Sequence, residues 1–429
     1  MSPSPLRLGL AGLGTVGAGV LRLLQEEGRT MATRAGRPIE VVAVSARDRS
    51  RDRGVDLSPY AWEDDPVALA CRDDIDVFVE LMGGHEGRPK AAVEAALARG
   101  KDVVTANKAL LAHYGQELAL QAEAKGATIR SEAAVAGGIP VIKALTEGLT
   151  ANRMTRVMGV MNGTCNFILT RMQATGASYA EIFAEAQGLG YVEADPTLDV
   201  GGIDAAHKLA LLAALAFGTQ VDFDAVDVEG IERIAIEDIT RAADMGYRIK
   251  LLGVAQLTSR GLVQRMSPCL VPTNSPLGQL EGGTNMVVLE GEAVGQLALR
   301  GPGAGAGPTA SAVLADVIDL ARGFRRPCFG IPATELRQSA ASKVAVPAPY
   351  YLRITLADRP GALARVAAVL GEAGVSINRM RQYGHDEASA PVLIVTHRCA
   401  RADLDRALEG FAATGVVLGE PVAIRIEDN

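Results

Sequence analysis

Cysteine is scarce and dispersed in this chain. The five cysteines are odd in number and include no closely spaced pair. A zinc site or a redox motif usually shows such a pair, and a disulfide framework usually needs an even number. We therefore expect a reducing compartment, the cytoplasm. The five residues are Cys71, Cys165, Cys269, Cys328 and Cys399.

The chain also lacks an excess of positive charge. It has 43 lysines and arginines against 50 aspartates and glutamates, a formal net charge of -7 at pH 7. Proteins that bind nucleic acids usually carry a basic excess or a clustered basic face. Arg47, Arg49, Arg51 and Arg53 are interleaved with acidic residues, which is typical of a solvated loop. We expect no nucleic-acid partner.

Long apolar runs are missing as well. No stretch is apolar over the length that a membrane-spanning helix needs. The first residues, MSPSPLRLGLAGLG, lead directly into an apolar run and a glycine loop. They leave no room for the charged region, apolar region and cleavage site of a secretory leader. We expect neither a membrane anchor nor a leader.

The length and composition predict a globular protein of two or three domains, with 429 residues of which 48% are hydrophobic. In the first part of the chain, short apolar runs alternate with helical patterns. Strands are expected over 6–11, 39–45, 75–81 and 101–105, with an alanine-rich helix over 89–99. This alternation favours a Rossmann-like α/β domain with a doubly wound parallel sheet.

The pattern changes in the middle of the chain. Helices are expected over 178–188 and 203–217, and antiparallel strands between 249 and 300. Together they predict an α+β substrate domain. A second glycine-rich stretch, GPGAGAGPTASAV from Gly301, leads into a helical pattern over 308–322. We therefore expect the chain to return to its first domain there.

The last part of the chain has a self-contained pattern. Residues 331–349 are rich in alanine, serine and proline, which marks a linker. Residues 350–429 then follow a βαββαβ order, the ferredoxin-like split unit. The predicted division is a Rossmann-like dinucleotide-binding domain over 1–150 with a return at about 301–330, a substrate-binding catalytic domain over 151–300, a linker over 331–349 and a ferredoxin-like domain over 350–429.

The loop GLGTVG has the spacing of a dinucleotide-binding site. Gly12 permits a tight turn, Gly14 lets the pyrophosphate approach, and Gly17 permits close contact between helix and strand. Because the loop follows an apolar strand and precedes a helix, the amides around Thr15 and Val16 would face the phosphates. We expect NAD or NADP as the cofactor.

The residues after the second strand bear on the choice between the two cofactors. An acid there usually binds the ribose hydroxyls, whereas an arginine suits the 2′-phosphate of NADP. Arg47 and Asp48 both follow the strand. We favour NADP with Arg47 as the phosphate partner. An ordinary loop arginine is an equally good interpretation, so NAD stays open.

Two lysines stand where chemistry is expected. Lys108 follows directly on a strand end, at the edge where open α/β sheets bind ligands, although it also fits a solvated helix start. Lys208 lies four residues after Asp204 on an apolar helix, where an ion pair can hold the amine in position. Such a lysine, if desolvation lowers its pKa, can pass a proton to a carbonyl oxygen. A surface ion pair is the plainer alternative.

Other polar residues carry weaker signals. Carboxylates such as Glu193 and Asp204 could bind the ammonium group of an amino acid. Cys165 lies in a turn before a helix, where a thiol can become acidic and act as a nucleophile, or simply pack. The histidines have no metal-ligand spacing, and we assign them no chemistry. They are His85, His113, His207, His385 and His397.

Five motifs, in order between residues 6 and 330, together resemble homoserine dehydrogenases. The glycine loop is shared with many unrelated dehydrogenases, whereas the last two motifs are highly specific. Residues 350–429 resemble an ACT domain through ADRPGALARVAAVLGEAGVSINRMRQ. No aspartate kinase accompanies them, so the resemblance is to monofunctional members. The five motifs are GLGTVG (12–17), TANK (105–108), SEAAVAGGIP (131–140), MNGTCNF (161–167) and GYVEADPTLDVGGIDAAHKLA (190–210).

The resemblance implies NAD(P)-dependent interconversion of L-aspartate 4-semialdehyde and L-homoserine, in threonine, methionine and isoleucine biosynthesis. It implies that Lys208 donates and accepts the proton at the substrate oxygen, and that Lys108 contacts cofactor and substrate. Glu193 and Asp204 would bind the substrate amino group or orient the lysine, with Asp199 close by.

The resemblance implies further sites. Gly163 would lie in the substrate site, and Gly307 near the nicotinamide, where a missing side chain lets the backbone approach the ring. A structural sodium ion would be bound through one carboxylate region and main-chain carbonyls, a reasonable donor set for a hard cation. The residues implied for sodium are Glu132, Val135, Gly137 and Ile139.

The ACT-like part implies an amino-acid effector. Such domains bind amino acids where two of them pair, and the expected effector is L-threonine as a feedback inhibitor. Asp358, Gly361 and Asn378 would form the ligand edge. Pairing also makes a homodimer or homotetramer the expected assembly.

Two other functions stay open from the sequence. Aspartate-semialdehyde dehydrogenase would use Cys165 as an acylating thiolate. A non-catalytic sensor of nucleotide and amino acid would also combine a Rossmann-like head with an ACT-like tail.

Overall fold

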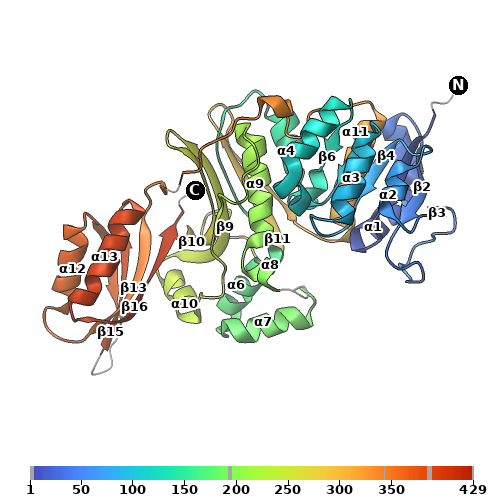
Figure 1. Ribbon diagram of the computed structural model, residues 1–429. Helices are drawn as coiled ribbons and strands as arrows, with labels where there is room; N and C mark the ends of the chain where they lie inside the picture. The colour runs from blue at the N-terminus through green and yellow to red at the C-terminus, as the bar shows by residue number, and fades with distance from the viewer. Residues whose placement is uncertain (1–3, 192–195, 343, 384–388, 428–429) are drawn as a thin grey trace.

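The protein is built on two β-sheets, each covered by helices (Figure 1). The computed structural model describes residues 4–191, 196–342, 344–383 and 389–427. Within those ranges, no helix combines the length and the apolar character that crossing a membrane requires.

The first sheet has six parallel strands in the order β3-β2-β1-β4-β5-β6. Every residue of β4 and β5 is buried, as their continuous apolar runs require in a parallel sheet covered on both faces. The predicted Rossmann-like sheet is confirmed. Its strands are β1 (Leu6–Ala11), β2 (Ile39–Ser45), β3 (Ala61–Trp62), β4 (Val77–Glu80), β5 (Asp102–Thr105) and β6 (Ile129–Arg130).

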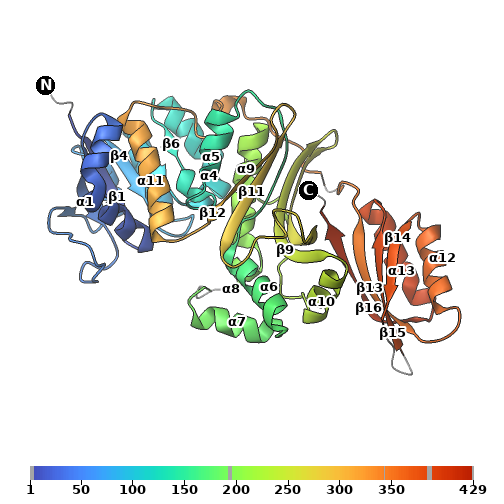
Figure 2. The ribbon, with the colours of Figure 1, turned by 180° about the vertical axis from the view of Figure 1, so that it is seen from behind.

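Helices cover both faces of this sheet (Figures 1 and 2). On one face, Leu8 and Leu10 share an apolar cluster with Val20 of the first helix and Val313 of a helix near residue 310. The chain thus returns to the first sheet after leaving it. The helices of that face are α1 (Thr15–Ala35) and α11 (Ala306–Ala321), and those of the other are α2 (Pro66–Cys71), α3 (Arg88–Ala98) and α4 (Lys108–Ala124).

The second sheet is mixed and larger. Its main order is β12-β11-β7-β9-β10-β16-β13-β15-β14, with β8 beside β10. The antiparallel strands expected between 249 and 300 are present. The strands are β7 (Met154–Val160), β8 (Asp227–Val228), β9 (Tyr247–Thr258), β10 (Gly261–Pro272), β11 (Thr284–Gly291), β12 (Gly295–Pro302), β13 (Tyr350–Ala357), β14 (Ile377–Gln382), β15 (Ser389–Thr396) and β16 (Val417–Ile426).

One almost wholly apolar helix, α9 (Ile203–Phe217), lies between the two sheets (Figure 1). It packs against α4 on one side and against β7, β9 and β10 on the other. Its first turn therefore lies close to the ends of both sheets. The other helical segments are η1 (Glu132–Ala134), α5 (Val141–Lys143), η2 (Ala144–Gly148), α6 (Gly163–Thr175), α7 (Tyr179–Gly188), α8 (Pro196–Val200), α10 (Ile236–Asp244) and η3 (Ala333–Glu335).

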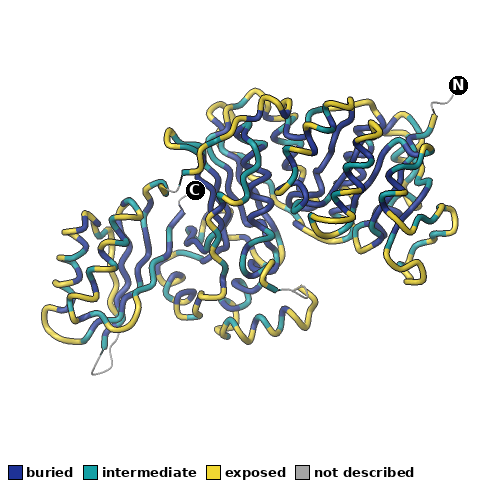
Figure 3. The backbone as a smooth tube through the Cα atoms, in the orientation of Figure 1, coloured by how far each residue is buried: buried dark blue, intermediate teal, exposed yellow. Residues whose placement is uncertain are grey.

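The C-terminal part has the predicted βαββαβ order, with α12 (Ala362–Glu372) and α13 (Arg401–Ala413) on one face of its strands. It has an apolar cluster of its own. β16 pairs in parallel with β10, so both parts share one sheet. Without this pair, β10 would leave backbone groups unpaired at a sheet edge. In Figure 3 the strands are largely buried, whereas the outer sides of the helices are exposed.

Candidate active site

Two neighbouring cavities follow the carboxyl ends of the first sheet. The larger, about 670 Å³, lies between the first sheet and the elements of the second. The smaller, about 430 Å³, continues over the glycine loop to the loop after β2. Both are lined by Leu81 and Met82, which follow β4. The cavities together form one elongated cleft, which we call the cofactor cleft.

The glycine loop is built to approach a ligand closely. A Cβ on Gly12, whose φ is +99°, would lie 2.4 Å from the carbonyl oxygen of Leu81, and one on Gly17 would lie 2.0 Å from that of Gly12. A Cβ on Gly14 would meet nothing within 4 Å. Gly14 also gives α1 no side-chain cap, so the first amides of the helix can bind an anion. Thr15 and Val16 line the larger cavity.

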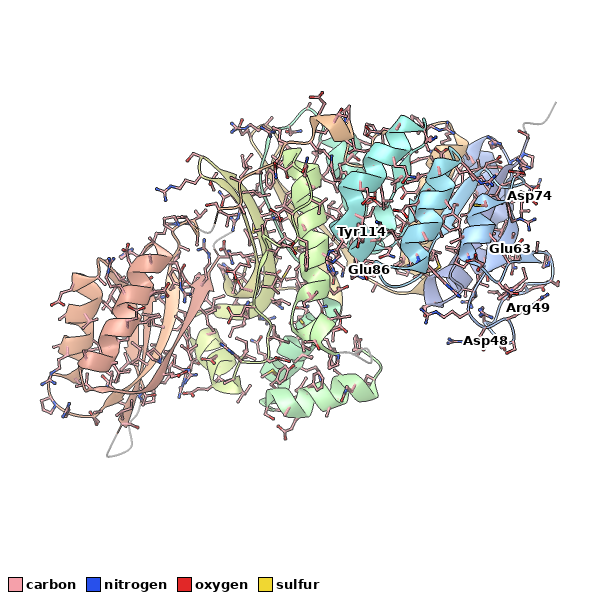
Figure 4. All side chains as sticks on the ribbon, viewed as in Figure 1. Asp48, Arg49, Glu63, Asp74, Glu86 and Tyr114 are labelled. Carbon is pink, nitrogen blue, oxygen red and sulfur yellow. The ribbon has the colours of Figure 1, made fainter. Side chains whose placement is uncertain are left out.

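Arginines surround the far end of the cleft. Arg47, Arg51 and Arg88 line the smaller cavity together with Asp48. Arg53 departs from the predicted solvated loop, because its guanidinium donates to the carbonyl oxygens of Leu13 at 3.1 Å and Arg51 at 2.6 Å. Figure 4 shows Asp48 and the neighbouring Arg49 on this loop.

The larger cavity contains a cluster of two lysines and one carboxylate. Lys208 Nζ lies 2.7 Å from Asp204 Oδ2, and Lys108 Nζ lies 2.8 Å from Asp204 Oδ1. Lys208 Nζ also donates to the carbonyl oxygen of Met161 at 2.8 Å. Lys108 is the first residue of α4, beside the first sheet, whereas the other three belong to the second domain. The cluster therefore joins the two domains.

Burial and charge set the state of this cluster. Burial alone would raise the pKa of Asp204, but the ammonium groups of Lys208 and Lys108 outweigh it and hold that pKa well below its usual value. The carboxylate is therefore ionised. Two N–H bonds of Lys208 are used within the protein. A third can reach an oxygen in the cavity.

Asn162 arranges the floor of the same cavity. Its side-chain oxygen accepts the backbone N–H of Cys165 at 2.8 Å, which caps α6, and its amide donates to Asp199 Oδ1 at 3.2 Å. Gly163 and Asp199 both line the cavity. A Cβ on Gly163 would lie 2.7 Å from the carbonyl oxygen of Gly283. The structure thus brings these predicted residues together with Lys208.

Some predicted residues lie elsewhere. Glu193 falls outside the described residues. Gly307 lies in the first turn of α11, where an added Cβ would meet nothing within 4 Å, while its neighbours Gly303 and Gly305 line the cavity with Thr309.

The interpretation of Cys165 as a nucleophile is wrong. Its side chain is fully buried in the first turn of α6, and its thiol lies 3.3 Å from the carbonyl oxygen of Asp199. Burial, together with the charges of Asp199 and Asp204, raises the pKa of the Cys165 thiol far above its usual value. No thiolate for acylation is available at neutral pH.

Three histidines gather beside the cluster, which sequence reasoning did not foresee. The rings of His85 and His113 stack at 4.2 Å, and those of His113 and His207 lie 5.5 Å apart. Burial lowers the pKa of His207 to about 4, so its ring is neutral. Among the described residues, no group of three or more His, Cys, Asp or Glu side chains is placed to hold a metal ion.

The loop implied for sodium is buried and strained. Glu132 uses both carboxylate oxygens to accept the backbone N–H groups of Ile142 and Lys143, at 2.9 and 2.8 Å. Burial, with the nearby Asp316, raises the pKa of Glu132 to about 7. Ala136 has a φ of +56°, which a non-glycine residue rarely adopts. Its neighbours Val135, Gly137 and Ile139 are buried as well.

The residues implied for the effector do not meet within one chain. Asp358 follows β13, and Gly361 directly precedes α12. The last residue of β13, Ala357, pairs with Ser389, the first residue of β15. Asn378 lies at the start of β14, which pairs with the other end of β15. The eight residues of β15 separate these groups by about 23 Å.

Sequence reasoning missed Glu80, which lies at the end of β4 below the cleft. It is fully buried and accepts the hydroxyl of Thr105 at 2.6 Å and the backbone N–H of Met82 at 2.7 Å. Burial raises the pKa of Glu80 to about 7. The signal that could have identified Glu80 is an acidic residue at the end of an otherwise apolar strand.

Comparison with known families accounts for most of the chain. Family models match in three places: "Homoserine dehydrogenase, NAD binding domain" over 12–132, "Homoserine dehydrogenase" over 140–318 and "ACT domain" over 350–411. A homoserine dehydrogenase of Pseudomonas aeruginosa is 42% identical over 432 residues, and one of Bacillus subtilis is 38% identical over 429. Each alignment covers 99% of both chains.

Solved structures agree with the sequence comparison. The crystal structure of a homoserine dehydrogenase from Thiobacillus denitrificans matches with a TM-score of 0.94 and 40% identity, and covers all of both chains. A hyperthermophilic archaeal homoserine dehydrogenase in complex with NADPH shares the fold at a TM-score of 0.65 and 24% identity, and covers 75% of this chain and 99% of that one.

Proposed function

The chain belongs to the homoserine dehydrogenase family, and we propose that its catalytic centre is the cluster of Lys208, Asp204 and Lys108. It is an NAD(P)-dependent oxidoreductase with a C-terminal ACT domain. Its substrates are those of the family, L-aspartate 4-semialdehyde and L-homoserine. The observation that carries the proposal is a buried ammonium group, held by a carboxylate, on the wall of the cofactor cleft.

Lys208 is proposed to move the proton. When bound, the nicotinamide supplies or accepts the hydride. In reduction, the ammonium of Lys208 protonates the aldehyde oxygen, which gains negative charge as the hydride arrives, and in oxidation the neutral amine takes the hydroxyl proton. Asp204 and the Met161 carbonyl fix the amine in position. Lys108 holds the other oxygen of Asp204 and would contact cofactor and substrate.

The substrate's amino group is proposed to face the carboxylate side of the same cavity. Asp199 lies on the cavity wall, and its carboxylate is oriented by the amide of Asn162. Gly163 lets the start of α6 pack closely on the Gly283 backbone, because a Cβ there would lie 2.7 Å from the Gly283 carbonyl oxygen. Glu193, which the family resemblance adds to this set, lies in the adjacent segment outside the described residues.

We propose NADP as the preferred cofactor. Four arginines line the smaller cavity, Arg47, Arg51, Arg53 and Arg88, against two acids, Asp48 and Asp64, and they can pair with the 2′-phosphate. Arg47→Ala should raise KM for NADPH roughly tenfold or more while leaving KM for NADH nearly unchanged. Arg49→Ala is the matched control, because Arg49 does not line the cavity. Equal effects on both cofactors would count against Arg47.

A sodium ion is proposed to bind the loop that contains Glu132, Val135, Gly137 and Ile139. A donor set made of carboxylate and main-chain oxygens suits a hard cation, and the positive φ of Ala136 fits a loop held by such a ligand. The ion would hold the loop and take no part in the reaction. Replacing sodium by choline should lower the melting temperature at constant ionic strength, and an unchanged value would remove the ion from the account.

L-threonine is proposed as the effector, bound where two ACT domains pair. The separation of Asp358 and Gly361 from Asn378 supports a site shared by two chains, since one chain cannot bring them to the same amino acid. A homodimer or homotetramer follows. We also propose the domain division predicted from the sequence, and a cytoplasmic location, in keeping with amino-acid biosynthesis and five free thiols.

The test of the proposed function is steady-state oxidation of NADPH with L-aspartate 4-semialdehyde. Lys208→Met should lower kcat by about 10²–10⁴-fold with little change in cofactor binding, because it removes the acid but keeps the apolar stem. Lys90→Met, a surface lysine of α3 paired with Glu94, is the control and should behave as wild type. Wild-type turnover by the Lys208 variant would contradict the proposal.

A further inference from the structure

The C-terminal domain joins the catalytic sheet along a short seam. β16 pairs with β10 at two positions, Cys269 with Arg425 and Leu270 with Ile426. The backbone N–H of Glu427 then donates to the carbonyl oxygen of Leu270 at 2.8 Å. Figure 1 shows β16 reaching toward β10. This pairing carries the side chain of Glu427 into the catalytic domain.

The carboxylate of Glu427 lies among three guanidinium groups from three strands. Glu427 is only 4% exposed, and it pairs with Arg156 of β7, Arg265 of β10 and Arg425 of β16. The Nε of Arg425 lies 2.5 Å from Oε1. Burial alone would raise the pKa of Glu427, but the arginines, Arg265 foremost, lower it. The carboxylate therefore stays ionised and ties the three strands together.

One of these arginines lies on the strand that leads to the catalytic centre. Arg156 is on β7, which pairs with β11 on one side and β9 on the other. The residue after β7 is Met161, whose carbonyl oxygen accepts the Lys208 ammonium at 2.8 Å. The next residue, Asn162, holds Asp199. Arg156 and Met161 are about 16 Å apart along a strand with partners on both edges.

We propose that Glu427 is a positioning residue for the reaction. By holding Arg156, it fixes β7 relative to β10 and β16, and it thereby fixes the Met161 carbonyl against Lys208. A shift of the C-terminal domain relative to the catalytic domain would therefore move β7, and with it the Met161 carbonyl that holds the Lys208 ammonium group. The proposal rests on the proposed role of Lys208, but its structural part concerns β7 alone.

A second contact between the same domains provides a matched control. Arg353 of β13 lies 2.6 Å from Asp238 and 3.1 Å from Glu237, both on α10. This pair also helps to seat the C-terminal domain. It involves no residue of β7 and none of the Lys208 cluster. Breaking this ion pair therefore weakens the contact between the two domains but leaves the pair of Arg156 and Glu427 intact.

The experiment compares Glu427→Gln, Arg156→Gln and Arg353→Met in the full-length protein. Each is measured for kcat, for KM of both substrates, and for hydrogen exchange of residues 154–162. Glu427→Gln and Arg156→Gln should each lower kcat about fivefold or more, leave KM for NADPH unchanged and speed exchange in 154–162. The double variant should be no worse than either single variant, because both remove the same link.

The control separates positioning from general loosening. Arg353→Met should keep wild-type kcat and wild-type exchange in 154–162. Equal loss of kcat in the Arg353 variant would overturn the proposal, as would unchanged exchange in both variants of the Glu427–Arg156 pair. If one of that pair does not fold, the other gives the same readout. Hydrogen exchange does not depend on which residue donates the proton, so failure of the Lys208 assignment would be seen separately.

Discussion

At the scale of single residues, the site depends on groups whose surroundings change their charge. Two ammonium groups hold the pKa of Asp204 well below its usual value, whereas burial raises the pKa of Glu80 to about 7, so that Glu80 is about half protonated at neutral pH. Asp204 lines the larger cavity, and Glu80 is the last residue of β4, directly before Leu81, which lines it. Their opposite pKa shifts follow from the presence or absence of a positive partner.

Glu80 makes the stability of the fold depend on pH. Its folded-state pKa of about 7 lies above the ordinary value of 4.5, so the buried carboxyl carries no penalty below pH 4.5, and the fold loses stability as pH rises from 4.5 to about 7. Glu80→Gln removes this group. Relative to wild type, the variant should gain about 2–3 kcal/mol of unfolding free energy between pH 5 and pH 8.

Urea unfolding at the two pH values checks this prediction. Glu26→Gln is the control, because Glu26 is exposed on α1. Its stability difference from wild type should be the same at both pH values. A Glu80 variant that loses stability at pH 8 relative to pH 5 would show that the carboxylate is favoured in the fold.

The residues of the site could be predicted only where a side chain carries the signal. Lys208 and Asp204 were found because their spacing of four places them on one helix face. The role of the Met161 carbonyl could not be predicted, because every residue has a backbone oxygen and the residue type gives no sign of its use. Asn162 lies in a recognised motif, but its two hydrogen bonds depend on the turn into α6.

At the scale of elements, two glycines of the same loop have different roles: Gly17 permits close packing of α1, and Gly14 leaves space for a ligand. Gly14 has an extended backbone that alanine can adopt, and a Cβ there would enter open space in front of α1. Gly14→Ala should therefore keep the wild-type melting temperature but weaken NADPH binding roughly tenfold or more, since a clash worth about 1.4 kcal/mol is enough.

Gly17→Ala is the matched variant. Its Cβ would lie 2.0 Å from the carbonyl oxygen of Gly12, so the helix must shift. We expect a loss of about 1–3 kcal/mol of stability as well as weaker cofactor binding. Calorimetric melting and titration with NADPH measure both quantities. If Gly14→Ala bound NADPH as wild type does, the pyrophosphate would not lie at this loop.

Most elements could be predicted from periodicity, and the exceptions have physical reasons. Four strands of the first sheet, β1, β2, β4 and β5, are apolar runs whose positions were predicted within about two residues, whereas the two-residue strands β3 and β6 were missed because they are too short to show a periodicity. β7 was missed because its sequence, MTRVMGV, mixes charge with small and apolar residues. Its partners on both sides, which lie far away in the sequence, make it a strand.

At the scale of the whole molecule, the effector site should need two chains. Asp358 and Asn378 lie at opposite ends of β15, so each proposed site would combine one residue from each copy. Asp358→Ala and Asn378→Ala should each abolish inhibition by threonine without lowering basal activity. Mixed dimers of the two variants would contain one intact site and one site with both changes.

Mixing the two variants tests this arrangement. Subunit exchange in an equimolar mixture should restore part of the inhibition that neither variant shows alone. A mixture of the Asp358 variant with wild type, measured in parallel, shows how much inhibition a dimer with one intact site gives. Absence of any restoration in dimers shown to have exchanged would mean that each chain binds the effector by itself.

The joining of the two sheets could not be read from the sequence. Residues 350–427 fit a complete ferredoxin-like unit, and nothing in their periodicity requires a further partner. The pairing of β16 with β10 depends on the free edge of β10, which lies far away in the sequence. It also depends on Arg156 and Arg265, which both pair with Glu427.

The most direct test of the account is a crystal structure of the protein with NADP and L-homoserine. The account predicts that Lys208 Nζ lies within about 3.2 Å of the homoserine hydroxyl oxygen, still paired with Asp204. A structure in which that oxygen contacts another acid while Lys208 points away from the nicotinamide would contradict it.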